Sequence, residues 1–127
     1  MKKKVVYICS SFRPTGGNPA IEQYQNVELA KRACKRAVKQ GHAVLCPHLV
    51  YPQFLADGIP QEREQGIMAG LRELELADEV WVVGSRISEG MSREISRAGA
   101  MGIPIKCIGD PRVAEDRLLE AVLGVRR

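Results

Sequence analysis

Short apolar runs alternate along the chain with longer segments of helical periodicity. The runs extend over residues 4–9, 43–46, 79–83 and 104–108. Their apolar character is continuous, as it is in strands that are buried on both faces, whereas half-exposed strands alternate. We therefore predict four buried strands over these runs.

Helical patterns fill the segments between and after the runs. The first covers residues 21–40, the second covers residues 60–77, the third follows Ser88 and ends near Gly102, and the fourth begins after Asp110. Strands that alternate with helices are typical of a parallel sheet with helices on both faces. The sequence thus predicts an α/β fold, a flavodoxin/Rossmann-like three-layer sandwich with about four to five parallel strands.

Length and composition bound the class of protein. The 127 residues are enough for one domain, and 45% of them are hydrophobic, which can fill an ordinary core. No stretch approaches the roughly 20 apolar residues that span a bilayer, so we expect a cytoplasmic protein with no membrane partner. The net charge of +4 is modest, and the basic face of the first helix lacks interleaved aromatic residues. We therefore do not expect nucleic acid as a partner.

The four cysteines show neither a C-x-x-C pair nor zinc-finger spacing. Three of them lie in predicted strands, where a free cysteine behaves as a small buried hydrophobic residue. We interpret all four as reduced core residues and expect no metal. The chain also lacks the Walker and G-x-G-x-x-G signatures of nucleotide and dinucleotide cofactor sites, and we expect no cofactor.

In a sheet of this class, ligands bind beyond the carboxyl ends of the strands, where the strand order reverses. The loops at residues 10–18 and 84–90 leave such ends, and the long irregular stretch at residues 47–59 could close over the same crevice. The first loop places Ser10, Ser11, Phe12 and Arg13 directly after a strand. Arg13 could hold a phosphate through several donors, or it could be a solvated loop cation.

The third helix contains an acidic residue on its buried side. Met91, Ile95 and Ala98 define the buried stripe, and Glu94 lies three residues after Met91 on the same side. An unpaired buried carboxylate is costly, so it is normally paired, marginal or used in function. The alternative to a functional role is a marginal glutamate favoured by the amino end of the helix.

Other residues near the expected crevice fit a small ligand. Ser88 has the position of a helix cap, and Gly90 would let a ligand approach the first-turn amides, although capping alone would also explain Ser88. Tyr7 and Phe12 end the first strand, where they could stack on a nucleobase or simply pack. His48, beyond the second strand, could face a ligand.

The second helix contains Gly66 and Gly70, each of which costs roughly 1 kcal/mol in a helix interior relative to alanine. This cost indicates the close approach of another backbone or of a ligand. Glu73 lies on the same side of the helix, one turn beyond Gly70.

Three segments, at residues 5–13, 77–83 and 88–95, resemble the nucleoside 2-deoxyribosyltransferase superfamily, which includes deoxynucleoside 5'-monophosphate N-glycosidases. The resemblance covers about residues 5–108 and extends to uncharacterised bacterial and phage members. It implies that Glu94 is the nucleophile and that Tyr7 positions it. It also implies that the region of Ser10, Ser11, Arg13 and Ser88 holds a 5'-phosphate, and that the chain forms a dimer or higher homo-oligomer.

The sequence departs from the superfamily at one position. An aspartate that handles the proton of the leaving base corresponds to Gly70 here, and such proton transfer is commonly worth about 10²- to 10⁴-fold in rate. Glu73, Glu64 or Asp57 could substitute for it. Two hypotheses therefore stand: an N-glycosidase or deoxyribosyltransferase acting on a nucleoside or nucleotide, and a non-catalytic nucleotide binder or sensor. Flavin-based redox chemistry has no support beyond the fold class.

Overall fold

The computed structural model describes residues 2–14, 16–84 and 86–109. One parallel sheet forms its centre, with the strand order β2-β1-β3-β4. The strands are β1 (Val5–Cys9), β2 (Ala43–Leu45), β3 (Glu79–Val83) and β4 (Ile105–Gly109). Each strand lies within one residue of its predicted bounds, and the predicted parallel α/β fold is confirmed.

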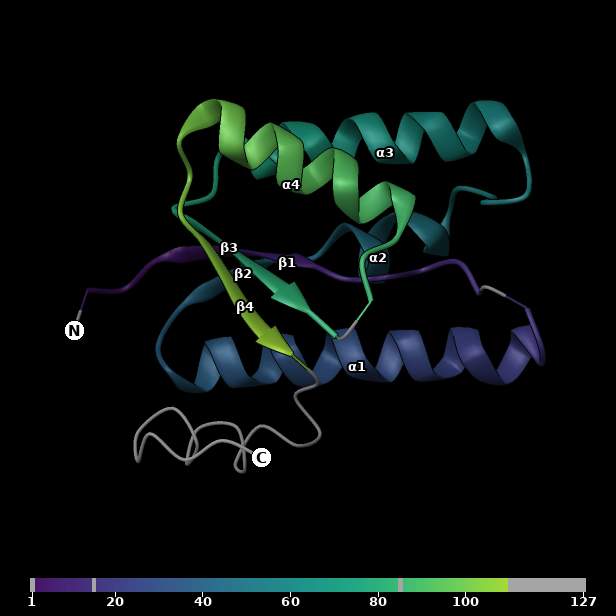
Figure 1. Ribbon diagram of the computed structural model, residues 1–127, viewed down its shortest axis with the longest axis horizontal. Coiled ribbons are helices and arrows are strands. Elements are labelled where there is room, and N and C mark those ends of the chain that lie inside the picture. Colours follow the sequence, from purple (N-terminus) through teal and green to yellow (C-terminus); the bar gives the residue numbers. More distant parts are fainter. Residues whose placement is uncertain (1, 15, 85, 110–127) are drawn as a thin grey trace.

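Helices cover both faces of the sheet (Figure 1). They are α1 (Pro19–Lys39), α2 (Pro47–Val50), the 3-10 helix η1 (Tyr51–Gln53), α3 (Pro60–Leu74) and α4 (Glu89–Met101). Alanines of α1 pack on one face against Val6, Ile8 and Trp81. Leu74 of α3 and Met91 of α4 pack on the other face. The three-layer arrangement predicted from the alternating pattern is therefore present.

Several details differ from the predictions. The helix expected over residues 60–77 ends at Leu74, and the stretch expected to be irregular contains α2 and η1. Cys107, interpreted as a core residue, is exposed, because β4 is an edge strand with an exposed centre. The helix predicted after Asp110 lies outside the described residues.

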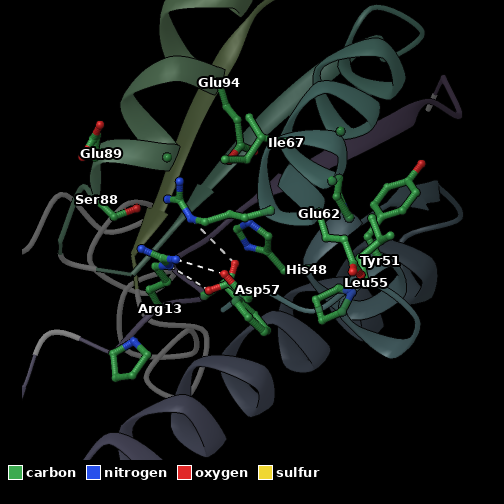
Figure 2. A pocket seen from close by; sticks show the side chains of 18 of the residues that line it. Arg13, His48, Tyr51, Leu55, Asp57, Glu62, Ile67, Ser88, Glu89 and Glu94 are labelled. Atoms are coloured by element: carbon green, nitrogen blue, oxygen red, sulfur yellow. Dashed lines mark hydrogen bonds and ion pairs between the residues drawn. The ribbon is translucent and has the colours of Figure 1, made fainter. Parts of the chain in front are cut away.

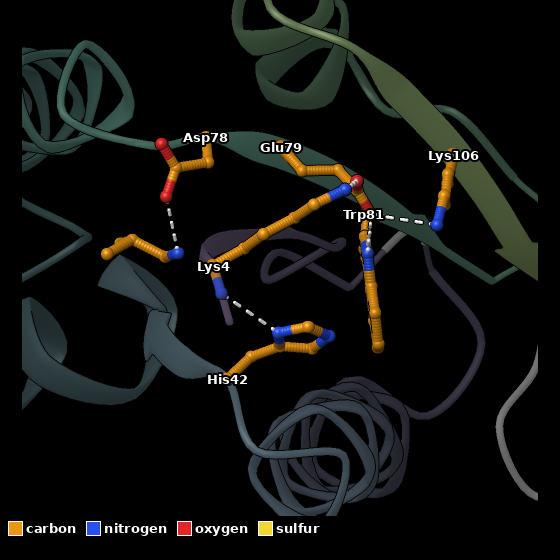
Figure 3. A network of polar contacts seen from close by, with 7 residues as sticks. Lys4, His42, Asp78, Glu79, Trp81 and Lys106 are labelled. Carbon is orange, nitrogen blue, oxygen red and sulfur yellow. Dashed lines mark hydrogen bonds and ion pairs between the residues drawn. The ribbon is translucent and has the colours of Figure 1, made fainter. Parts of the chain in front are cut away.

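A polar network joins the amino ends of the strands (Figure 3). Glu79 of β3 is buried and accepts from the Lys4 Nζ at 2.7 Å, from the Trp81 Nε1 at 2.7 Å and from the Lys106 Nζ at 3.2 Å. The His42 Nδ1 accepts from the Lys4 backbone N–H at 3.1 Å. This end of the sheet is thereby fixed by side chains from β3, from β4 and from the residues that precede β1 and β2.

The opposite end of the sheet is open to a ligand for a topological reason. The chain passes from β1 outward to β2 and then returns across β1 to β3. Connections therefore leave the carboxyl ends of β1 and β3 in opposite directions, which leaves a crevice between them. Among the described helices, none is long and apolar enough to cross a membrane.

Candidate functional site

A cavity of about 450 Å³ lies at the carboxyl ends of the strands (Figure 2). Its walls come from the end of β1 and the loop that follows it, from α2 and η1, from α3 and from the beginning of α4. The residues predicted from the sequence that line it are Tyr7, Phe12, Arg13, His48, Ser88, Gly90 and Glu94. Side chains from positions far apart in the sequence therefore meet at one hollow.

Glu94 lies on the second turn of α4, directed into the molecule by the same helical face that buries Met91 and Ala98. Its exposed fraction is only 6%. Burial raises the pKa of this carboxyl to about 7, and hydrogen bonds from the Tyr7 hydroxyl and the Cys9 thiol partly oppose that rise. The Glu94 Oε2 is buried without a hydrogen-bond partner among the described residues. Glu94 itself lines the cavity, so its carboxyl group lies beside any ligand that binds there.

Tyr7 is the central residue of β1 and faces α3 and α4. Its side chain is buried, and burial together with the neighbouring carboxylate of Glu94 raises the pKa of its hydroxyl. The tyrosine therefore keeps its proton at neutral pH and donates it in the hydrogen bond to Glu94. This hydrogen bond joins β1 to α4 and fixes the direction in which the Glu94 carboxylate points.

His48, on the short helix α2, lies on the cavity wall with its ring 5.7 Å from that of Phe12. Burial lowers the pKa of His48 to about 4, against the opposing effects of Asp57 and of a hydrogen bond to the Ser10 backbone. The imidazole is therefore neutral at pH 7. Its Nδ1 is buried and has no hydrogen-bond partner in the described part of the chain.

Two arginines converge on one carboxylate at the cavity mouth. Arg13, from the loop after β1, donates from Nε to the Asp57 Oδ2 at 2.7 Å and from a terminal nitrogen to the Asp57 backbone oxygen at 3.0 Å. Arg63 of α3 lies 3.7 Å from the Asp57 Oδ1. Asp57 thus holds two cations at the edge of the hollow.

The beginning of α4 forms another part of the wall. The Ser88 hydroxyl accepts from the Met91 backbone N–H at 3.2 Å, which confirms its position as the helix cap. Gly90 adds no side chain between the first-turn amides and the cavity, and these amides favour an anionic group.

Three of the predicted site residues lie elsewhere. The Ser11 hydroxyl is directed at the Met91 sulfur, at 3.3 Å. Ser10 is fully buried, and its hydroxyl has no hydrogen-bond partner in the part of the chain that the structure describes. Glu73 does not line the cavity, but it accepts from the hydroxyl of Tyr51, which does. None of these three side chains is among those that line the hollow.

Gly70 does lie on the cavity wall, and the structure explains the glycine. A Cβ atom at this position would lie 3.1 Å from the Pro47 Cγ and 3.3 Å from the Tyr7 hydroxyl oxygen. The space that a longer residue would use is thus filled by Pro47. The paired glycines predicted the approach of a backbone or a ligand, whereas the nearest atoms at Gly70 belong to the side chains of Pro47 and Tyr7.

Several charged or apolar residues that line this cavity were not among those predicted from the sequence, and four of them bear on its chemistry. They are Glu62, Arg63, Ile67 and Arg86. For α3 a signal did exist, because Arg63, Ile67 and Gly70 recur at helical spacing and share the face that Gly70 marks. No comparable signal identifies Arg86, which follows β3 in an irregular loop.

No group of three or more histidine, cysteine, aspartate or glutamate side chains that could hold a metal ion occurs in residues 2–14, 16–84 and 86–109.

In α/β proteins ligands commonly bind at the switch point of a parallel sheet, and a solved enzyme has a similar fold. The 2-deoxyribosyltransferase from the psychrotolerant bacterium Bacillus psychrosaccharolyticus matches 81% of this chain over 70% of its own, with a TM-score of 0.57 and 20% sequence identity. The fold expected from the superfamily resemblance is thereby confirmed. No curated protein matches the chain by sequence.

The chain belongs to the family described as "Domain of unknown function (DUF7768)", which matches residues 4–108. The matched region includes the described residues of the cavity wall and the four strands, except for Gly109 at the end of β4.

Proposed function

We propose that this protein cleaves the N-glycosidic bond of a deoxynucleoside or its 5'-monophosphate, with Glu94 as the nucleophile. One observation carries the proposal: the carboxylate of Glu94 is buried at a cavity, is hydrogen-bonded to a tyrosine on the neighbouring strand, and has one oxygen without a partner among the described residues. The fold shared with a 2-deoxyribosyltransferase supports the same reaction class.

The reaction would proceed in two displacements. The ionised Glu94 carboxylate attacks the anomeric carbon, the carbon–nitrogen bond breaks, and the base departs with the bonding electrons and takes up a proton. Water then attacks the glycosyl ester to release the sugar, or a second base attacks it to form a new nucleoside. The Tyr7 hydroxyl is the group that holds Glu94 in line for the first step.

The rest of the cavity suits the two ends of a nucleotide. The guanidinium group has five donors, and two contacts with Asp57 leave others of Arg13 for a phosphate, next to Ser88 and the first amides of α4. At the other end, Phe12, His48 and Tyr51 offer rings to a base. The neutral His48 can accept a hydrogen bond from a base N–H.

Gly70, which stands where the superfamily has an aspartate, has no side chain that could deliver a proton to the leaving base. Of the three carboxylates considered as substitutes, Glu64 pairs with Arg93 on the surface and Glu73 binds Tyr51. Asp57 lines the cavity but is engaged by two arginines. We therefore propose that the base takes its proton from solvent water in the cavity, which favours bases that leave readily.

The proposal is tested by incubating the protein with deoxynucleosides and their 5'-monophosphates and measuring free base by chromatography. We expect the unmodified protein to release base and Glu94→Gln to lower the rate at least about 10³-fold. Glu64→Gln is the matched control, because that carboxylate lies on the surface, and it should retain full activity. Equal release by Glu94→Gln would reject Glu94 as the nucleophile.

A second candidate function is favoured by the contact between Gly70 and Pro47. Because this contact fills the space for an acidic side chain, the chain could bind a nucleotide without turning it over. A binder would show nucleotide-dependent thermal stabilisation with no free base after long incubation, whereas an enzyme would show base release.

We also propose that copies of the chain associate. The segment 51–55 next to the cavity carries Phe54, which is 65% exposed, and the preceding Val50 is exposed as well. Analytical ultracentrifugation should show a dimer or larger assembly at micromolar concentration, and Phe54→Asp should shift it toward monomer. A monomeric unmodified protein would remove this proposal.

A further inference from the structure

Two cysteines far apart in the sequence meet outside the cavity. Cys34 lies in the middle of α1, and Cys46 follows β2 and caps α2. Cys34 packs against the core cluster that contains Cys46, and each thiol shifts the pKa of the other. All cysteines of the chain's described part are free.

The two thiols differ in their access to solvent. Cys34 is half-buried, so a small oxidant can reach it, while Cys46 is only 7% exposed. The hydrogen bond from the Cys46 thiol lowers the pKa of Cys34, and the same bond, together with burial, raises the pKa of Cys46. The accessible sulfur is therefore the more readily ionised one, as a thiol that attacks an oxidant needs to be.

We propose that Cys34 and Cys46 form a reversible disulfide on exposure to a peroxide. The Cys34 thiolate attacks one peroxide oxygen, the O–O bond breaks, and a sulfenic acid and hydroxide form. The Cys46 sulfur then attacks the Cys34 sulfur, the S–O bond breaks, and water leaves with the Cys46 proton. Two thiols and one hydrogen peroxide thus give one disulfide and two waters, with the two sulfurs supplying both electrons.

The position of this bond connects it to the candidate site. Cys46 directly precedes Pro47, which lines the cavity and packs against Gly70. A disulfide would therefore tie α1 covalently to the residue that begins the α2 wall. Neither sulfur belongs to the cavity lining, so the inference does not depend on the proposed function.

The other cysteines provide internal comparisons. Cys107 is exposed, so access alone should make it at least as reactive as Cys34. Cys9 is buried, and burial raises the pKa of its thiol. If contact between thiols decides the outcome, the Cys34–Cys46 disulfide should dominate over every other product.

The test uses the reduced full-length chain, treated with hydrogen peroxide, alkylated and mapped by peptide mass spectrometry. We expect a cross-linked pair of peptides containing Cys34 and Cys46, lost on treatment with a dithiol, as the main product. Cys107→Ser should leave its yield unchanged. In Cys46→Ser, oxidation should stop at a Cys34 sulfenic acid that a dimedone probe captures.

Mapping the unmodified protein decides the question even if a variant fails to fold. Oxidation confined to Cys107, or Cys34 oxidised without a bond to Cys46, would overturn the inference. A second readout is the pH dependence of Cys34 alkylation, which should shift to higher pH in Cys46→Ala, because this variant removes the donor that a serine would keep. An unchanged profile would show that Cys46 does not act on Cys34.

Discussion

Glu94 is a carboxylate held where its charge is unfavourable. Its pKa in the folded chain is about 7, against an ordinary value near 4.5 in an unfolded chain. The folded state therefore binds the proton more tightly. The contribution of Glu94 to stability is therefore most favourable below pH 4.5 and is lost as the pH rises through about 7, because folding then places an ionised group in a buried position.

We accordingly expect Glu94→Gln to stabilise the protein at pH 8 by roughly 1–3 kcal/mol and to change little at pH 4. Urea unfolding of both proteins at the two pH values measures the difference. The rate of base release should also increase as the pH rises through about 7, because Glu94 then ionises and only the ionised carboxylate is a nucleophile. An equal stability change at both pH values would mean that the raised pKa is not the cause.

The two glycines of α3 make different contacts, and this gives a matched pair of variants. A Cβ at Gly66 would lie 3.5 Å from the Leu55 Cδ1, an ordinary contact, whereas at Gly70 it would lie 3.1 Å from the Pro47 Cγ. Gly66→Ala should gain about 0.5–1 kcal/mol from helix propensity. Gly70→Ala should be less stable than Gly66→Ala by about 1–3 kcal/mol, because Pro47 must shift.

Thermal or urea unfolding of the two alanine variants checks this difference. If Gly70→Ala proved as stable as Gly66→Ala, the packing of Pro47 would not explain the glycine. The comparison also bears on function, since a tolerated side chain at position 70 would reopen that space for an acidic residue.

The position of a side chain could be predicted from the sequence where the helical repeat of one segment determines which way that side chain points. Glu94 could be placed inward because it follows Met91 by three residues on one helix, and Ser88 could be placed as a cap from its position. Contacts across the sequence were not predictable. The Arg13–Asp57 pair, the fit of Pro47 over Gly70 and the Tyr51–Glu73 hydrogen bond depend on how α2 and η1 lie against their neighbours.

At the scale of elements, the amino ends of the strands are joined through one buried acid. The hydrogen bonds from Lys4, Trp81 and Lys106 outweigh the effect of burial and lower the pKa of Glu79 to about 2. A depressed pKa stabilises the fold above the unfolded value near 4.5. That stability is lost as the pH falls from about 4.5 to about 2.

Glu79→Gln should therefore destabilise the protein by roughly 1–3 kcal/mol at pH 7, with a smaller effect near pH 3. Glu28→Gln is a suitable control, because its ion pair with Lys31 lies on the surface of α1 and contributes at most about 1 kcal/mol. Urea unfolding as a function of pH distinguishes the two. A Glu79→Gln effect that did not depend on pH would contradict the role given to the network.

Elements with clear periodicity were predicted within a few residues, and shorter ones were not. The four residues of α2 are too few to show a helical pattern, and η1 contains a proline that reads as a turn. The end of α3 was placed three residues late, because Leu76 and Ala77 continue the apolar pattern after the helix has ended at Leu74. The bounds of these elements depend on tertiary contacts, which the local sequence pattern does not reveal.

At the scale of the whole molecule, the strand order creates the crevice, and the elements around it supply chemically different walls. Tyr7 comes from β1, His48 from α2, Arg63 from α3 and Glu94 from α4. A nucleotide that fills this cavity contacts all four elements, so it should stabilise the folded chain as a unit. We expect the thermal midpoint to rise with nucleotide concentration, and Arg13→Ala to weaken the rise for a monophosphate more than for a nucleoside.

Differential scanning fluorimetry with paired nucleosides and monophosphates measures this effect. A loss that is equal for both ligands would show that Arg13 does not recognise the phosphate. No midpoint shift with either ligand class would argue against a nucleotide site in the cavity.

The most direct test of the account is to look for sugar bound covalently to Glu94. The protein is mixed with a reactive deoxynucleotide, denatured rapidly and mapped by peptide mass spectrometry. The account predicts a deoxyribosyl adduct on the peptide that contains Glu94, absent from Glu94→Gln, together with release of free base. Base release with no adduct at Glu94 and full activity in Glu94→Gln would contradict it.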